Sequence, residues 1–141
     1  MSKQRKILSV LFVLVLGTIG FLYGTTDVAR KSIQFDLRKI GESIYEAHSK
    51  TGKWPAKIAD LEGTEYLNMP YRRDALEKGL FVIIWQQDLK SDPKQNRDRI
   101  VAYDNGSLFA RLGWIWACRG DLTVERVSSA ELASELASRP Q

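Results

Sequence analysis

The feature that most constrains this chain is an apolar run that contains no charged residue from Ile7 to Thr26. A helix rises ~1.5 Å per residue, so a run of this length covers the roughly 30 Å hydrocarbon core of a bilayer. We therefore predict a transmembrane helix over 7–26. The residues that we expect to form the membrane anchor are Ile7, Leu8, Leu11, Phe12, Leu14, Leu16 and Phe21.

The flanks of this run predict its orientation. Lys3, Arg5 and Lys6 precede it, and fewer uncompensated basic residues follow it. By the positive-inside rule, the basic tail 1–6 stays in the cytoplasm and 27–141 is exported. A cleaved signal peptide is the alternative, but its apolar region usually has about 7–15 residues, and no A-x-A cleavage pattern follows here. We expect an uncleaved, single-pass signal anchor in the cell (inner) membrane.

Three glycines, Gly17, Gly20 and Gly24, lie in the anchor. Gly20 and Gly24 have the small-xxx-small spacing that lets two helix backbones approach closely. Glycine is also common in transmembrane helices, so an anchor without a specific helix partner is the simpler interpretation. The glycines therefore leave open a helix–helix contact within the bilayer.

Charge and ligand residues exclude several classes of function. The 141 residues carry 21 Lys and Arg against 17 Asp and Glu, and the basic tail accounts for most of this excess. Nucleic-acid binding would need a basic stripe on the folded domain, so we expect no nucleic-acid partner. Cys118 is the only cysteine and His48 the only histidine, too few for a disulfide or a structural zinc site. We expect no cofactor and no metal.

Beyond the anchor, apolar residues recur at the 4,3 spacing of one helix face, at Ile33, Leu37, Ile40, Ile44 and Ala47. The other face is polar, with Gln34, Asp36, Arg38, Lys39, Glu42, Ser43 and Glu46. The pattern predicts an amphipathic helix over 27–50 that continues the anchor and packs its apolar stripe on a head domain. We expect Gly52 to end this helix and Trp54-Pro55 to begin a short helix over 56–61.

Four runs rich in β-branched and aromatic residues predict strands over 80–85, 99–103, 113–118 and 122–127. The short turn 119–121 favours an antiparallel hairpin between the last two. Ser128 and Glu131 have the spacing of a capping box for a final helix to about residue 138, with Leu132, Ala133 and Leu136 as its apolar side. The predicted fold class is α+β, a long N-terminal helix on a small antiparallel sheet.

Trp114 and Trp116 are two residues apart on one predicted strand and so share a sheet face, opposite Ile115 and Ala117. The tryptophan pair either builds the core under the long helix, which we favour, or presents an aromatic surface to a partner. With Trp85, these residues are the candidate partner surface. A pocket lined by Trp85, Trp114 or Tyr103 would indicate ligand binding.

The remaining reactive groups have structural explanations. His48 lies near a helix end, where an imidazolium would meet unpaired carbonyls, and no nucleophile motif accompanies it. Cys118 lies in an apolar run and is predicted to be a buried small side chain. Asp98, Asp104 and Asp121 could offer oxygens to calcium, but Asn105-Gly106 favours a hydrogen-bonded turn. We expect no enzymatic activity.

Two stretches resemble type IV pilins and type II secretion pseudopilins. Asp36-Leu-Arg-Lys-Ile-Gly41, followed by Tyr45, Gly52 and Pro55, is similar to their L-R-x-I-G stretch and G-x-x-P exit. The segment 113–132 resembles the closing hairpin and helix of planctomycete-type pilin-like proteins. The chain lacks a recognisable prepilin peptidase site, the family's glutamate inside the apolar helix and the family's D-G-H turn. The resemblance implies a pilin-like exported head that works by protein–protein contacts.

Two functions follow from these features. The first is a non-enzymatic membrane protein with a pilin- or pseudopilin-like head, acting in a secretion, pilus-like or envelope assembly. Its partners would be the lipid bilayer and other membrane or envelope proteins, self-association included. The second is a membrane-tethered module that binds a ligand or partner without polymerising.

Overall fold

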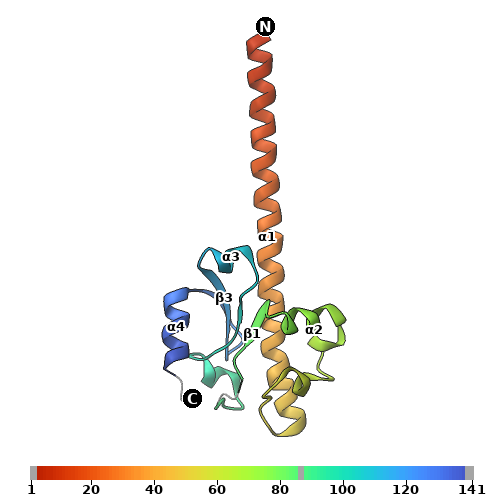
Figure 1. Cartoon of the computed structure of the whole chain (residues 1–141), viewed down its shortest axis with the longest axis vertical. Coiled ribbons are helices and arrows are strands. Elements are labelled where there is room, and N and C mark those ends of the chain that lie inside the picture. The colour runs from red at the N-terminus through yellow and green to blue at the C-terminus, as the bar shows by residue number, and fades with distance from the viewer. Residues whose placement is uncertain (1–2, 86–87, 139–141) are drawn as a thin grey trace. The chain divides into compact units, whose positions relative to one another are not determined.

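The computed structural model describes the backbone of residues 3–85 and 88–138, and the side chains in those ranges outside 3–11 and 19–25. It divides into two compact units, Met1–Ser32 and Ile33–Gln141, and we call the second the head unit. One helix, α1 (Lys3–Thr51), begins in the first unit and ends in the second (Figure 1). Within the described part of the chain, no helix combines the length and the hydropathy needed to cross a membrane.

In the first unit, Phe12, Leu14 and Leu16 lie on α1 with more than half of each side chain exposed. A Cβ atom added at Gly17 would meet nothing within 4 Å. The other anchor and glycine positions, Ile7, Leu8, Leu11, Gly20, Phe21 and Gly24, fall outside the residues whose side chains are described.

The second half of α1 packs into the head unit. Leu37 and Ile40 are fully buried, Ile44 and Ala47 are nearly so, and Ile33 is partly buried against the same cluster. Ser43 is also buried, so its predicted place on the polar face was wrong. It is buried because this small side chain lies between the buried rows of the helix. Gly52, at a φ of 71°, ends the helix as predicted, and its N–H donates to the His48 carbonyl at 2.7 Å.

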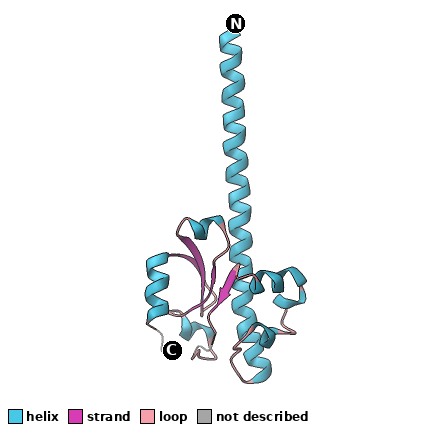
Figure 2. Cartoon of the chain, viewed as in Figure 1, coloured by secondary structure: helices cyan, strands magenta, loops and turns pink. Residues whose placement is uncertain are grey.

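The head unit contains a four-stranded antiparallel sheet in the order β1-β2-β3-β4 (Figure 2). The strands are β1 (Phe81–Ile83), β2 (Ile100–Asp104), β3 (Trp114–Arg119) and β4 (Val124–Ser128). The predicted hairpin between the last two is confirmed, with Trp114 opposite Ser128 and Cys118 opposite Val124. The predicted α+β class, with a long helix and an antiparallel sheet, is therefore confirmed.

Each sheet face has its own apolar cluster. On one face, Val101, Ala102 and Cys118 join the buried stripe of α1. On the other, Ile115, Ala117 and Val127 pack with Leu132 of α4 (Ser129–Ala137). Alternate residues of β3 belong to the two clusters, which places α1 and α4 on opposite sides of the sheet.

Short helices fill the connections: η1 (Ile58–Leu61), η2 (Tyr66–Asn68), α2 (Pro70–Glu77), η3 (Pro93–Asn96) and α3 (Leu108–Arg111). The predicted 56–61 helix is corrected, because it is a 3-10 turn that begins at Ile58 and leaves Pro55 outside. Sequence reasoning missed η2, α2, η3 and α3. Pro70 at the first position of α2 has the fixed φ that suits a helix start.

The predicted cap of α4 is half correct. Ser128 Oγ accepts the N–H of Glu131 at 3.1 Å, as a capping serine does. The Glu131 carboxylate, however, accepts from Arg119 instead of returning to the helix start. Ala133 and Leu136 are exposed, so the predicted apolar side of this helix reduces to Leu132.

Candidate functional site

The three tryptophans proposed as a partner surface do not lie together. Trp85 packs with Ile44, Trp54 and Leu89 around a residual cavity of about 10 Å³, too small for more than one water. Trp116 is partly buried against the cluster under α1. Trp114, on the same sheet face as Trp116, is 53% exposed. The structure therefore separates the tryptophans into two core residues and one surface residue.

Trp114 belongs to an exposed apolar surface that it forms with α3. Leu108 is 68% exposed and Leu112 is 66% exposed, at the start of α3 and just after its end. We call Leu108, Leu112 and Trp114 the α3 surface. Arg126, opposite Trp116 in β4, places its guanidinium carbon 4.8 Å from the centre of the Trp114 ring. Sequence reasoning missed the two leucines, although their i,i+4 spacing beside a tryptophan was a usable signal.

The turn before α3 is held by Asp104. This buried carboxylate accepts the N–H groups of Gly106 at 3.2 Å and Ser107 at 3.1 Å, and also the Ser107 hydroxyl. Ser107 Oγ in turn accepts the N–H of Ala110 and caps α3. Asp104 is thus engaged in the hydrogen-bonded turn that the sequence favoured over a calcium loop.

Asp98 and Asp121 do not join Asp104. Asp121 accepts from the Thr123 hydroxyl at 2.6 Å and from its N–H at 3.1 Å, and these bonds lower the pKa of its carboxyl against the effect of burial. Asp98 is exposed. Among the described residues, no three His, Cys, Asp or Glu side chains gather closely enough to hold a metal ion.

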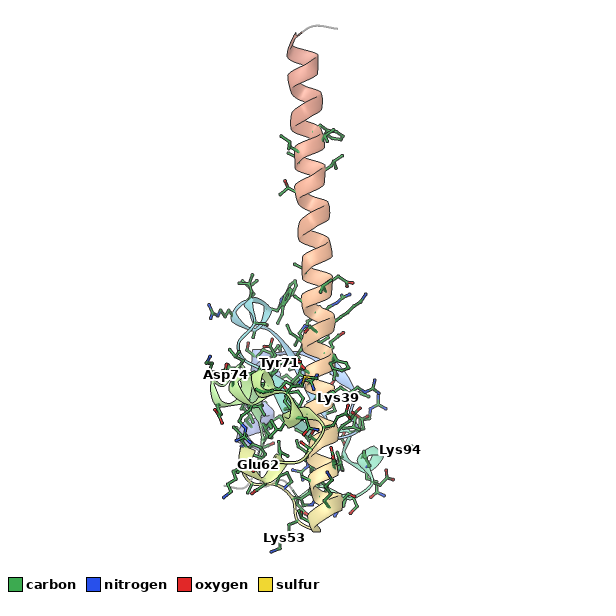
Figure 3. The ribbon with its side chains drawn as sticks, turned by 90° about the vertical axis from the view of Figure 1, so that its right-hand side faces the viewer. Lys39, Lys53, Glu62, Tyr71, Asp74 and Lys94 are labelled. Atoms are coloured by element: carbon green, nitrogen blue, oxygen red, sulfur yellow. The ribbon has the colours of Figure 1, made fainter. Side chains whose placement is uncertain are left out.

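A second exposed group lies where α1 meets α2. The Arg72 guanidinium carbon is 4.9 Å from the Tyr66 ring centre, 5.6 Å from that of Tyr71 and 5.8 Å from that of Phe35. Asp36 pairs with Arg72 at 3.6 Å, and burial raises the pKa of its carboxyl although Arg72 opposes the rise. Phe35 and Tyr71 remain more than half exposed, and Figure 3 shows Tyr71 beside the helix.

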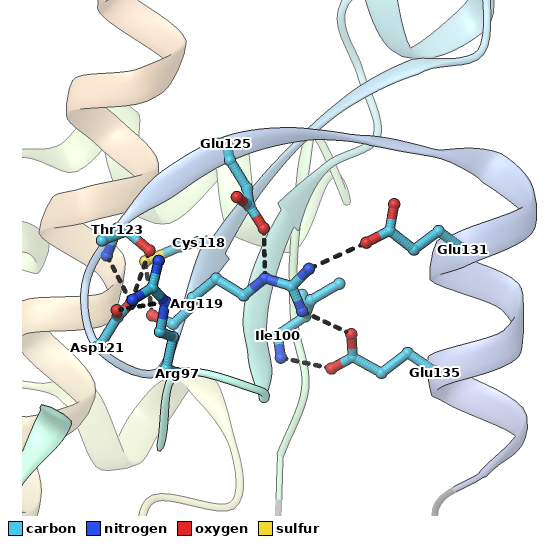
Figure 4. A network of polar contacts seen from close by, with 9 residues as sticks. All are labelled: Arg97, Ile100, Cys118, Arg119, Asp121, Thr123, Glu125, Glu131 and Glu135. Atoms are coloured by element: carbon cyan, nitrogen blue, oxygen red, sulfur yellow. Dashed lines mark hydrogen bonds and ion pairs between the residues drawn. The ribbon is translucent and has the colours of Figure 1, made fainter. Parts of the chain in front are cut away.

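Arg119 holds α4 to the sheet (Figure 4). Its guanidinium donates to Glu125 at 2.6 Å and to both Glu131 and Glu135 at 3.0 Å. Glu135 also accepts the backbone N–H of Ile100. Arg119 thus links β3, β4 and α4, while Glu135 also binds the backbone of β2, so the role of this cation is structural.

His48 and Cys118 both lie in packed surroundings. The His48 ring stacks on Trp54 with 3.8 Å between centroids, and its buried Nδ1 has no hydrogen-bond partner within the described structure. Cys118 is fully buried, and burial raises the pKa of its thiol to about 12. Its Sγ contacts the Arg119 carbonyl at 3.4 Å. A thiol with so high a pKa carries little of the reactive thiolate near neutral pH.

A partly buried polar contact joins α1 to the β3–β4 turn. The Tyr45 hydroxyl donates to the Gly120 carbonyl at 2.6 Å and accepts from Asn96 at 2.8 Å. Asn96 also bonds both backbone groups of Lys90. Burial raises the pKa of the Tyr45 hydroxyl. Sequence reasoning did not single out Asn96, because its side-chain partner Tyr45 lies 51 residues away in the chain.

The chain shows no significant match to any protein-family model, curated protein or solved structure.

Proposed function

We propose that the chain is a non-enzymatic, single-pass membrane protein whose exported head works by contacts in a secretion, pilus-like or envelope assembly. The observation that carries this proposal is the composition of α1. One helix contains both the uncharged run from Ile7 to Thr26 and the stripe from Ile33 to Ala47 that completes the head's core. Such a helix suits a protein in which the membrane anchor continues directly into the domain that makes the contacts.

The anchor is supported by the side chains of the first unit. Phe12, Leu14 and Leu16 are exposed on α1. Contact of these apolar side chains with lipid is more favourable than their contact with water. Lys3, Arg5 and Lys6 favour a cytoplasmic N-terminus. The head would then lie outside the cytoplasm.

The pilin-like character is supported by two features together. The first is the arrangement of the head unit, a helix stripe packed on one face of a four-stranded antiparallel sheet. The second is the position of the resembling motifs. A Cβ atom at Gly41 would lie 2.8 Å from Cys118 Sγ, and Gly52 ends the helix three residues before Pro55. The residues that carry the resemblance therefore lie where the helix packs on the sheet and where the chain leaves the helix.

Action through contacts is supported by the state of the two most reactive groups. Cys118 is buried with a raised pKa, and His48 is stacked on Trp54. Neither is presented to a substrate beside a nucleophile or base, as covalent or acid–base catalysis requires.

The second candidate is a membrane-tethered module that binds a ligand without polymerising. One feature favours it, a surface hollow of about 390 Å³ lined by Ala47, Thr51, Lys53, Trp54, Pro55, Ala56 and Asp60. Its size suits a small ligand, and Trp54 offers an aromatic wall. It does not include Trp85, Trp114 or Tyr103, the residues expected to line such a site.

A topology experiment tests the proposal. We expect a periplasmic-type reporter fused after Gln141 to be active, and the chain to stay in the membrane fraction after a carbonate wash. The N-terminus of the purified protein should precede Ile7. A reporter active only in the cytoplasm, or a mature N-terminus near Arg30, would contradict the anchored topology.

A further inference from the structure

Two contacts fix the direction of α1 along the sheet of the head unit. A Cβ atom at Gly41 would lie 2.8 Å from Cys118 Sγ, and Tyr45 bonds Gly120 just beyond β3. Eight helix residues at ~1.5 Å and four strand residues at ~3.3 Å both span about 12–13 Å. Ile33 lies eight residues before Gly41, and Trp114 lies four residues before Cys118. The two residues are therefore level with each other along the sheet. We call this end of the head unit the entry end, and α3 lies there (Figure 1).

Most of the exposed large apolar side chains of the head unit, six of eight, lie toward the entry end. In its described part, eight large apolar side chains are exposed. The α3 surface supplies three of them, and Leu80 adjoins it because its carbonyl accepts the N–H of Asn105 at 2.9 Å. Phe35, two residues from Ile33, and Tyr71 add aromatic rings around Arg72. Leu136, in the last turn of α4, lies at the opposite end because α4 starts beside Trp114 and runs away from it.

The charges beside the α3 surface are basic. Arg111 is exposed between Leu108 and Leu112, and Arg126 is exposed against the Trp114 ring. The nearby carboxylate of Asp104 is buried and bound by its own turn. Glu125 and Glu131 are paired with Arg119. The α3 surface thus offers leucine and tryptophan side chains flanked by guanidinium groups.

This chemistry fits the boundary of an anionic bilayer better than water. Tryptophan and leucine enter the boundary between headgroups and acyl chains, while arginines remain at the lipid phosphates. The chain also limits where the entry end can go. From Thr26 to Ile33, seven steps of at most ~3.6 Å reach about 25 Å, whatever their conformation.

We propose that the α3 surface rests on the outer surface of the bilayer that holds the chain, with Leu108, Leu112 and Trp114 inserted among anionic lipids and Arg111 and Arg126 at their phosphates. This inference rests on the membrane anchor proposed above. It assigns the entry end to lipid and leaves the rest of the head free for protein partners.

Quenching of tryptophan fluorescence by lipid tests the proposal on the full chain. The chain is reconstituted into phosphatidylcholine vesicles containing phosphatidylglycerol, with or without bromine on the acyl chains. We expect bromolipid to quench the emission, and Trp114→Phe to lose most of that quenching. Trp54→Phe is the matched control, because Trp54 follows Gly52 at the far end of the head, and it should retain the quenching.

Three further variants keep all four tryptophans. Replacing Leu108 and Leu112 by serine should abolish the quenching, whereas Leu136→Ser should leave it unchanged. In the unaltered chain, bromolipid should quench the emission more strongly in vesicles with phosphatidylglycerol than in vesicles without it. Replacing Arg111 and Arg126 by glutamine should remove this difference in quenching. These residues are exposed, and unchanged near-ultraviolet circular dichroism would verify the fold.

The outcomes separate the two proposals. A chain that fails to float with the vesicles overturns the anchor and, with it, the lipid contact. A chain that floats while Trp114 stays unquenched overturns the lipid contact alone. An emission from Trp114 that responds to the protein-to-lipid ratio and not to bromolipid would assign the surface to a second copy of the chain, and would also overturn it.

Discussion

Gly41 faces the sheet where α1 leaves no room for a side chain. A Cβ atom there would lie 2.8 Å from Cys118 Sγ and 3.0 Å from Leu122 Cδ2, both closer than ordinary contact. The obstructing atoms belong to side chains, and one of them is the only thiol of the chain. The fit between α1 and β3 thus depends on a missing methyl group opposite a small buried sulfur.

Gly41→Ala should therefore destabilise the head by overpacking, by about 1–3 kcal/mol. Cys118→Ala removes the sulfur, so the double variant should recover part of the loss, with a coupling energy of about 0.5–3 kcal/mol. Thermal unfolding of the four proteins, followed by near-ultraviolet circular dichroism, measures the cycle. Strictly additive losses would show that Cys118 does not set the distance between helix and strand.

The raised pKa of Cys118 predicts a pH dependence. Its folded value of about 12 exceeds the roughly 8.5 of a free thiol, so the folded state holds the proton more tightly. The resulting stabilisation is complete below the unfolded pKa and is lost as the pH rises from there toward the folded pKa. Alkaline pH should therefore destabilise the native chain more than the Cys118→Ala variant, as measured by urea unfolding across that interval.

Alkylation gives an independent measurement of the same thiol. Iodoacetamide at about pH 8 should label the native chain far more slowly than the chain in guanidinium, because labelling needs an accessible thiolate. Rapid labelling of the folded protein would place Cys118 at the surface and contradict its burial.

At the scale of elements, the sequence was most informative where a pattern was local and regular. The stripe of α1 and the β3–β4 hairpin follow from periods of 3.6 and 2 residues and from a short turn. The segment 62–79 has no such pattern, since Tyr66 and Leu76 are its main buried apolar residues. Elements η2 and α2 there depend on contacts with α1 and β1, which one local window does not contain.

The candidate site was predictable only in part for a related reason. Alternation along β3 correctly put Trp114 and Trp116 on one sheet face, but burial depends on how far α1 and the loops extend over that face. Trp116 is partly buried against the cluster under α1, whereas Trp114 is exposed although Ile33 lies level with it. The α3 surface also includes a four-residue helix, and its local sequence signal is only the i,i+4 spacing of Leu108 and Leu112.

Ile40 and Lys39 provide a matched test of α1 as a packing element. Ile40 is fully buried, so Ile40→Ala should cost about 2–5 kcal/mol of stability. Lys39 bonds Glu42 at 2.9 Å and Glu65 at 3.3 Å on the surface, and Lys39→Ala should have little effect. The melting temperatures of the two variants measure these two losses of stability. Equal losses would mean that the stripe does not carry the packing of the head.

At the scale of the whole molecule, α1 supplies residues to two different environments. Its head half is constrained by the core, because Leu37, Ile40 and Ile44 contact the cluster under the sheet. The half up to Ser32 belongs to the other compact unit. If the chain works in an assembly, that first half can carry specificity without any effect on the stability of the head.

Replacement of residues 7–26 tests where that specificity lies. In one chimera all positions become leucine, and in a matched chimera Gly17, Gly20 and Gly24 are kept. Both should anchor the chain, since leucine and glycine helices of this length span a bilayer.

If helices associate through the glycines, chemical cross-linking in native membranes should capture a second copy of the chain in the native protein and in the matched chimera. The all-leucine chimera should lose this cross-link, because leucine side chains keep the backbones apart. The Ile40→Ala variant serves as a control for head stability. Equal cross-linking in both chimeras would contradict association through the glycines and place the contact between copies in the head.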